Sequence, residues 1–212
     1  MNYIINNFKK IKTLIDNNKV NIIAVSKTFQ YEQIKPLIDY GHKHFGENKV
    51  QEATIKWAKV KLQMPEINLH MIGRLQSNKA KDAIKLFDYI HSLDSSKLAN
   101  LLAKFQHSLN LKRKYFIQIN IGNEKQKSGI KIEEADEFYN YCTKTLKLNI
   151  VGLMAIPPAD NNESKYFKLL MELNHSLGLV ELSMGMSADY RVALKYNTTF
   201  VRIGTAIFGK RI

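Results

Sequence analysis

The sequence predicts an α/β protein built as a closed (β/α)8 barrel of the TIM type, with one extra helix before the first strand. Eight short apolar segments are typical of buried strands, and their first residues run from Asn21 to Phe200, a mean step of about 25 residues. Such a step accommodates a strand, a helix and two loops. An open, doubly wound sheet is the structural alternative.

The expected strands are short apolar runs bounded by polar or turn-forming residues. They cover residues 21–26, 43–45, 68–72, 89–91, 115–121, 149–155, 181–184 and 200–203. The densest break signal, at 156–162, is interpreted as a surface loop between two periodic segments. We therefore expect one domain over residues 1–212.

Amphipathic helices are expected between these strands, because apolar residues recur there at spacings of three and four. The extra helix covers residues 3–16, and a last one, 188–196, has Ser187 as its expected N-cap. The others cover residues 31–40, 49–61, 95–108, 133–144 and 162–177.

Composition excludes several classes of protein. The single cysteine, Cys142, cannot form an internal disulfide or a cysteine-based metal site, which favours a reducing cytosol. No apolar run is long enough for a signal peptide or a membrane span, so we expect a cytoplasmic protein. The net charge is +13, but 27 of the 32 basic residues are scattered lysines and 5 are arginines. Diffuse charge predicts only weak, salt-sensitive attraction to nucleic acid, without specific recognition.

Chemistry in a (β/α)8 barrel is expected at the carboxyl ends of the strands. Lys27 ends the first apolar segment, where partial burial disfavours the ammonium form and leaves an amine able to form a Schiff base with an aldehyde. A lysine that only extends into solvent is the competing interpretation.

The last two strand ends predict an anion site, because barrels often hold phosphate in the loops after strands seven and eight. Gly204 and Thr205 offer backbone N–H groups and a hydroxyl, and Ser187 offers another hydroxyl. Turn geometry alone is the competing interpretation for Gly185 and Gly204. Together, this phosphate site and an imine-forming lysine suggest that the ligand is pyridoxal 5'-phosphate.

Arg202 lies on the eighth expected strand, where a buried guanidinium needs a partner. A ring nitrogen of the same cofactor would serve, and an ion pair with Glu47 or Asp189 is the alternative. His42 and His44 lack further ligands at metal-binding spacing, so we expect core or surface histidines and no metal site.

Seven ordered blocks then resemble the pyridoxal phosphate homeostasis protein family. The match is carried by residues 24–28, 45–48 with Gln51 and Glu52, 70–79, 127–129, 152–158, 182–187 and 201–209. The resemblance implies a barrel similar to the N-terminal domain of alanine racemase, with the cofactor held as a Schiff base on Lys27. It implies that Arg202 faces the pyridine nitrogen, that Ser187, Gly204 and Thr205 hold the phosphate, and that Asn48 lies beside the cofactor.

The family resemblance further implies binding, storage or delivery of the cofactor, pyridoxal 5'-phosphate (PLP). It also implies PLP-dependent apo-enzymes as partners. The chain ends at Ile212, just after the eighth expected strand, without the second domain that supplies a catalytic tyrosine in racemases. We therefore expect a non-catalytic, monomeric protein. The alternative is a small PLP-dependent racemase or lyase that uses Asn120, Ser183 or the Tyr190 region.

Three positions depart from the usual family pattern. Phe29 and Lys49 are expected at the rim of the pocket, where they affect transfer rate or partner choice more than binding. Asn197 occupies a turn where glycine is common, and we expect it to be harmless because asparagine tolerates a positive φ.

Overall fold

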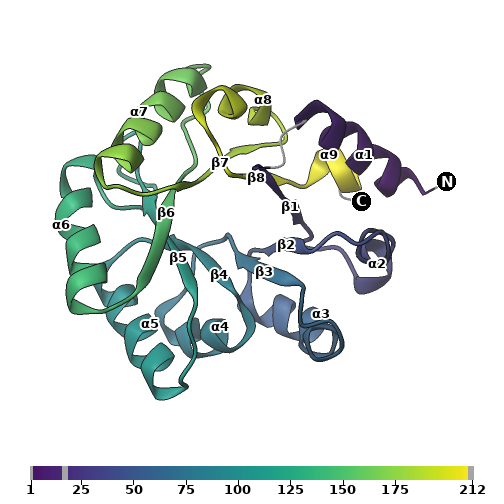
Figure 1. The fold of residues 1–212 in the computed structure, drawn as a ribbon, viewed down its shortest axis with the longest axis horizontal. Coiled ribbons are helices and arrows are strands. Elements are labelled where there is room, and N and C mark those ends of the chain that lie inside the picture. Colours follow the sequence, from purple (N-terminus) through teal and green to yellow (C-terminus); the bar gives the residue numbers. More distant parts are fainter. Residues whose placement is uncertain (1, 16–18, 210–212) are drawn as a thin grey trace.

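A computed structural model, which describes residues 2–15 and 19–209, shows a closed barrel of eight parallel strands in the order β1 to β8 (Figure 1). The strands are β1 (Asn21–Val25), β2 (His44–Glu47), β3 (Asn68–Met71), β4 (Tyr89–Leu93), β5 (Lys114–Ile119), β6 (Asn149–Ala155), β7 (Glu181–Met186) and β8 (Phe200–Ile203). All eight expected strands are confirmed, and the open sheet is excluded because β8 pairs with β1.

The helices surround the barrel. They are α1 (Tyr3–Ile15), α2 (Tyr31–Asp39), α3 (Val50–Gln63), α4 (Ala80–Leu86), α5 (Ser96–Ser108), α6 (Ala135–Asn140), α7 (Glu163–Ser176), α8 (Tyr190–Ala193) and α9 (Thr205–Phe208). The extra N-terminal helix is confirmed as α1, although Asp16, its expected last residue, lies outside the described residues. The short helices α4 and α9 were not predicted, because neither is long enough to display an apolar period.

Two expected helices differ in detail. The segment expected at 133–144 is irregular: a 3₁₀ turn (Ile132–Glu134) leads into α6, which continues as a π-helical turn (Tyr141–Thr145). The helix expected at 188–196 begins only at Tyr190 and ends in a 3₁₀ turn (Leu194–Tyr196). Asn197 then follows with φ = 56°, in the left-handed conformation that asparagine tolerates.

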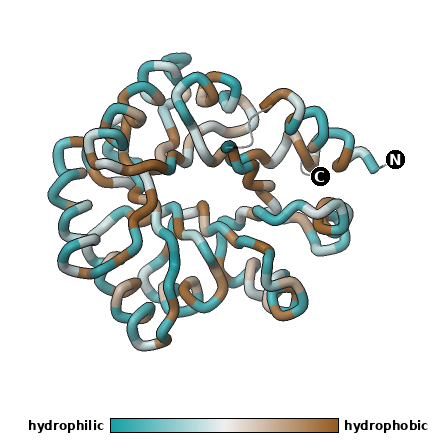
Figure 2. The backbone as a smooth tube through the Cα atoms, in the orientation of Figure 1, coloured by the Kyte–Doolittle hydropathy of each residue, from teal (hydrophilic) through white to brown (hydrophobic). Residues whose placement is uncertain are grey.

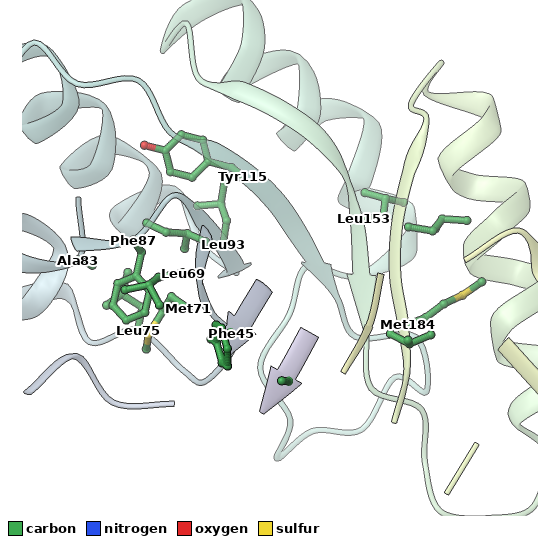
Figure 3. Close-up of a cluster of buried hydrophobic side chains, with 14 of the residues drawn as sticks. Phe45, Leu69, Met71, Leu75, Ala83, Phe87, Leu93, Tyr115, Leu153 and Met184 are labelled. Atoms are coloured by element: carbon green, nitrogen blue, oxygen red, sulfur yellow. The ribbon is translucent and has the colours of Figure 1, made fainter. Parts of the chain in front are cut away.

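The largest apolar cluster fills the space between the strands and the outer helices. Figure 3 shows part of it, where Phe45, Leu69 and Phe87 lie within one group of buried side chains. Along the outer helices hydrophobic residues alternate with hydrophilic ones (Figure 2), as expected for helices with one buried face. This layer holds the helices against the barrel.

Side chains on the other face of the strands fill the barrel itself. A small apolar cluster of Ile23, Tyr89, Phe116, Met154 and Phe200 lies there. Strand register places Arg202 beside Ile23, and Ser183 beside Phe200 and Met154, on the same inward face. The interior is therefore partly apolar and partly polar.

Helix α1 lies beside α9, so the two ends of the described chain meet (Figure 1). The Tyr3 hydroxyl donates to the Phe208 carbonyl and the Asn7 amide to the Ile207 carbonyl, each at 3.1 Å. The extra helix thus supports the segment that follows β8. No described helix is long and apolar enough to cross a membrane.

Candidate functional site

Lys27 follows strand β1 and opens a tight turn. The Ser26 N–H donates to the Gly46 carbonyl at 3.0 Å, and the Phe29 N–H donates back to the Ser26 carbonyl at 3.2 Å. Thr28, inside this turn, has φ = 69°. A β-branched residue adopts a positive φ only under strain, and such strain gathers at functional sites. The half-buried Lys27 is thus held on a strained turn at the carboxyl end of the strands.

A buried polar cluster fixes this turn from the helix side. One oxygen of Glu47 (Oε1) accepts hydrogen bonds from the Ser26 hydroxyl (2.7 Å), Lys56 Nζ (2.9 Å) and Trp57 Nε1 (3.0 Å). Lys56 Nζ also donates to the Ser26 carbonyl at 2.7 Å. Because Ser26 precedes Lys27, the cluster sets where that lysine leaves the strand.

Lys56 and Trp57 were not singled out from the sequence. Their only signal is that they lie on the expected amphipathic helix, nine and ten residues after Glu47. Buried apolar neighbours make Trp57 look like an ordinary core residue, and Lys56 resembles the many other lysines. Only the packing of α3 against β1 and β2 reveals their contact with the site.

Arg202 is 4% exposed and lies inside the barrel. Its Nη1 donates to the carbonyl and hydroxyl of Ser183 at 2.6 and 2.7 Å, and its Nη2 donates to the Ala155 carbonyl at 2.9 Å. These bonds use three of the five N–H groups of a guanidinium. Burial lowers the pKa of Arg202 to about 10, and the charge of Asp189 opposes this shift.

The sequence suggested an ion pair of Arg202 with Glu47 or with Asp189, and neither of these ion pairs forms. Glu47 pairs with Lys56 at 2.9 Å, and Asp189 Oδ1 accepts the Met186 N–H at 2.5 Å. Among residues 2–15 and 19–209, no carboxylate lies within ion-pairing distance of Arg202. A buried cation whose acceptors are all neutral favours a ligand that brings an acceptor or a negative charge.

The loops after β7 and β8 meet through Ser187, but the expectation that it caps a helix is wrong. Helix α8 begins at Tyr190 with Asp189 at its N-cap position, so Ser187 lies too early in the chain. Its hydroxyl instead accepts the N–H groups of Gly204 (3.3 Å) and Ala206 (3.4 Å). Ser187 therefore joins the two loops from which Gly204 and the exposed Thr205 extend.

The two glycines of these loops have different reasons to be glycine. Gly185 has φ = 92°, and a Cβ there would lie 2.8 Å from that of Ala193. Gly204 has φ = −110°, and a Cβ there would meet only ordinary contacts with Val25 at 3.4 Å or more. Turn geometry explains Gly185, whereas no described protein contact demands glycine at 204. Close approach of a ligand is a reason that remains for Gly204.

Asn48 lies where β2 ends, beside an open cavity of about 930 Å³. The cavity wall also includes Met71, Arg74 and Ser95, from the carboxyl ends of β3 and β4. Asn48 Oδ1 is buried and accepts no hydrogen bond from the described residues. A buried amide oxygen without a donor is available to a ligand.

The rim residues Phe29 and Lys49 have separate contacts. Phe29 packs on Phe208, with ring centroids 4.9 Å apart, and the exposed Lys49 pairs with Glu52 at 2.9 Å. Both lie beside the elements that carry Lys27 and Asn48.

The three places considered as sources of a catalytic acid or base have other partners. The Asn120 side chain bonds the backbone of its own loop at Glu124, donating at 2.9 Å and accepting at 3.1 Å. Ser183 is buried against Arg202, and the Tyr190 ring is 6% exposed. These side chains organise loops and core packing.

The family model described as the alanine racemase N-terminal domain matches residues 1–211. A protein of Aquifex aeolicus named pyridoxal phosphate homeostasis protein is 36% identical over 92% of this chain and 88% of its own. One of the same name from Haemophilus influenzae is 38% identical over 92% and 87%. A yeast relative of that name, from Schizosaccharomyces pombe, is 33% identical over 95% and 89%.

Solved structures share the fold. PipY of Synechococcus elongatus, solved with PLP bound, superposes with a TM-score of 0.88 at 31% identity, over 97% of this chain and 100% of its own. The alanine racemase of Clostridium difficile superposes with a TM-score of 0.77 at 17% identity, over 99% of this chain and 57% of the enzyme. The likeness to the racemase concerns the barrel fold alone.

Proposed function

Because the chain belongs to the pyridoxal phosphate homeostasis protein family, we propose that it binds pyridoxal 5'-phosphate reversibly and thereby stores or delivers it within the cytoplasm. The single observation that carries this proposal is the Arg202 guanidinium, which is buried and, among the described residues, bonds only neutral oxygen acceptors and keeps two N–H groups for a ligand. An unprotonated pyridine nitrogen is an acceptor of the required kind.

The proposed site assigns one role to each residue. A bound cofactor would supply an aldehyde, and the Lys27 amine would hold it as a Schiff base, with release of one water. Arg202 would donate to the ring nitrogen and disfavour its protonation, which would make the ring a weaker electron sink. Asn48 contributes its unpartnered amide oxygen at the side of the site.

The phosphate is assigned to Ser187, Gly204 and Thr205. The Ser187 hydroxyl accepts the N–H groups of Gly204 and Ala206, which holds it against the loop after β8 with its own proton available to a phosphate oxygen. The hydroxyl of the exposed Thr205 is a second donor of the same kind, and glycine at 204 lets the backbone approach the phosphate closely.

We propose that the protein does not catalyse amino-acid turnover, because Asn120, Ser183 and Tyr190 are committed to structural contacts. The alternative is a small racemase or lyase. Incubation of the purified, cofactor-loaded protein with D- or L-alanine, followed by chiral chromatography, should show no turnover. Racemisation that is lost in Lys27→Ala would overturn this part of the proposal.

PLP-dependent apo-enzymes are the proposed recipients, and a monomer is the proposed state. Closure of the barrel leaves no strand edge that needs a partner subunit. Light scattering of the purified protein tests the monomer. Recovery of activity by an apo-enzyme mixed with the cofactor-loaded protein, faster than cofactor dissociation alone allows, tests direct delivery.

Binding itself is tested by titration with pyridoxal phosphate, followed by absorbance and equilibrium dialysis. Lys27→Ala should abolish the Schiff-base absorbance and weaken binding about tenfold or more, a loss of about 1.4 kcal/mol or more. Lys168→Ala, on α7 with a side chain that is 63% exposed and pairs with Glu172, is the matched lysine control and should bind as the unmodified protein does. Equal binding by all three proteins would refute the assigned site.

A further inference from the structure

A continuous row of hydrogen bonds crosses the barrel interior and ends at Arg202. His44 Nδ1 lies 3.0 Å from His70 Nε2, His70 Nδ1 lies 2.9 Å from His91 Nε2, and His91 Nδ1 lies 2.8 Å from the Ser183 hydroxyl. That hydroxyl accepts from Arg202 Nη1 at 2.7 Å. The row uses residues of β2, β3, β4, β7 and β8, so only closure of the barrel assembles it.

Aromatic rings cover the two inner histidines of this row. Tyr89 stacks on His70 with ring centroids 4.4 Å apart, and Phe116 stacks on His91 at 4.3 Å. His70 and His91 are both fully buried. Burial lowers the pKa of each well below its ordinary value, so both imidazoles are neutral near neutral pH. Each neutral ring has one donor and one acceptor.

The proton order follows from which groups can accept. Arg202 cannot accept a hydrogen bond, so His91 Nδ1 is the acceptor for the Ser183 hydroxyl proton among its described neighbours. His91 must then carry its proton on Nε2 and donate it to His70, which in turn donates from Nε2 to His44. The opposite order would leave the Ser183 proton buried without an acceptor, which is costly.

We propose that His44, His70, His91 and Ser183 form a single proton-ordered relay, in which His91 and Ser183 are positioning residues for Arg202. Every lone pair in the relay faces the Arg202 cation and every proton points away from it. The order therefore keeps the Ser183 oxygen free to accept from Arg202 and holds the guanidinium in place. Because the relay ends at the half-buried His44, it links the proposed cofactor site to the opposite end of the barrel.

This inference rests on the proposed function, but its first test does not need the cofactor. Long-range ¹H–¹⁵N NMR of the full-length, ligand-free protein distinguishes Nδ1–H from Nε2–H imidazoles. We expect the Nε2–H form at His44, His70 and His91. A different form at any of the three would overturn the relay.

Two substitutions at the far end of the relay test whether it acts as one unit. His44→Leu removes the acceptor for His70 Nε2, so a population with the reversed order should appear at His91, two rings away. His44→Asn keeps an amide oxygen at the position of Nδ1 and should restore the single form. Ser183→Ala and Ser92→Ala form a second pair. Ser183→Ala removes the hydroxyl bonded to His91 and should alter the histidine forms. The buried Ser92 hydroxyl, next to His91 in the chain, has no partner among the described residues, so Ser92→Ala should leave all three histidines unchanged.

Titration of the same variants with pyridoxal phosphate tests the link to Arg202. Relative to the unmodified protein, His44→Leu should bind about two- to tenfold more weakly, the ratio expected for about one hydrogen bond, and His44→Asn should bind normally. Equal affinities with altered histidine forms would overturn the positioning role. If the unmodified protein does not bind at all, the proposed function fails, whereas the NMR result still decides the relay.

Discussion

The two faces of the same eight strands are built in different ways. Outward, Phe45, Leu69 and Phe87 pack with helix residues in a continuous apolar layer (Figure 3). Inward, apolar rings alternate with groups that need a hydrogen-bond partner, such as His70 and Arg202. The outer layer stabilises the barrel, whereas the interior stabilises one arrangement of polar groups at the candidate site.

This difference predicts where substitutions affect stability and where they affect binding. An outer side chain contributes through the volume it fills, and its loss leaves the strand ends unchanged. An inner polar side chain contributes through directional bonds, and its loss leaves its partners unsatisfied. The three predictions that follow separate these two effects, beginning with the largest.

Phe87→Ala tests the outer layer. The ring is fully buried, so its removal should lower the free energy of unfolding by about 3–5 kcal/mol. The folded fraction should bind pyridoxal phosphate with unchanged affinity. Urea unfolding and titration measure the two quantities, and Leu62→Ala, at a side chain 85% exposed, is the control that should change stability by less than about 0.5 kcal/mol. Weakened binding by folded Phe87→Ala would break the proposed division.

The buried histidines predict a pH effect of intermediate size. Burial keeps His70 and His91 neutral in the folded protein, while the unfolded chain takes up protons below about pH 6.5. Because the unfolded state then binds more protons, stability should fall as the pH drops, by about 2–3 kcal/mol for these two residues between pH 7.5 and 5.5. His42 and His44, whose pKa values burial lowers to about 4, add to this loss.

Urea unfolding at both pH values measures this loss. His91→Phe should reduce the pH-dependent part by about 1–1.5 kcal/mol, the share of one buried histidine, whatever its effect at pH 7.5. A pH-dependent part that is the same with and without His91 would show that the imidazole titrates in the folded protein.

Ser183→Ala should cause the smallest of the three losses in stability. It leaves Arg202 Nη1 with the Ser183 carbonyl alone and removes the partner of His91, so we expect a loss of about 1–3 kcal/mol. Pyridoxal phosphate should bind more weakly as well. Ser92→Ala removes a hydroxyl without a partner and should be nearly neutral in both measurements. Equal losses for the two serine variants would show that volume, not hydrogen bonding, governs the interior.

The sequence was informative where a local pattern determines the outcome. Apolar runs located all eight strands, and the residues that follow the first two runs placed Lys27 and Asn48 at strand ends. The helices α4 and α9 were not predicted because they are too short to show an apolar periodicity. The expectation that Ser187 caps a helix was wrong, because its hydroxyl is used in a contact between two loops seventeen residues apart.

The histidine row could not be predicted for a related reason. Its members are separated by 21 to 92 residues, and only strand register and barrel closure place their rings in contact. The polar cluster of Glu47, Lys56 and Trp57 likewise depends on how α3 packs. Local periodicity specifies which face a residue takes but not which partner it meets.

The central claim is that Lys27 carries pyridoxal phosphate at the carboxyl end of the barrel. Borohydride reduction of the purified protein, after incubation with pyridoxal phosphate, converts a Schiff base into a stable adduct that peptide mass mapping can locate. The predicted result is one stoichiometric adduct on the peptide containing Lys27, absent in Lys27→Ala. An adduct on another lysine, or no adduct in a protein that binds the cofactor, would contradict the account.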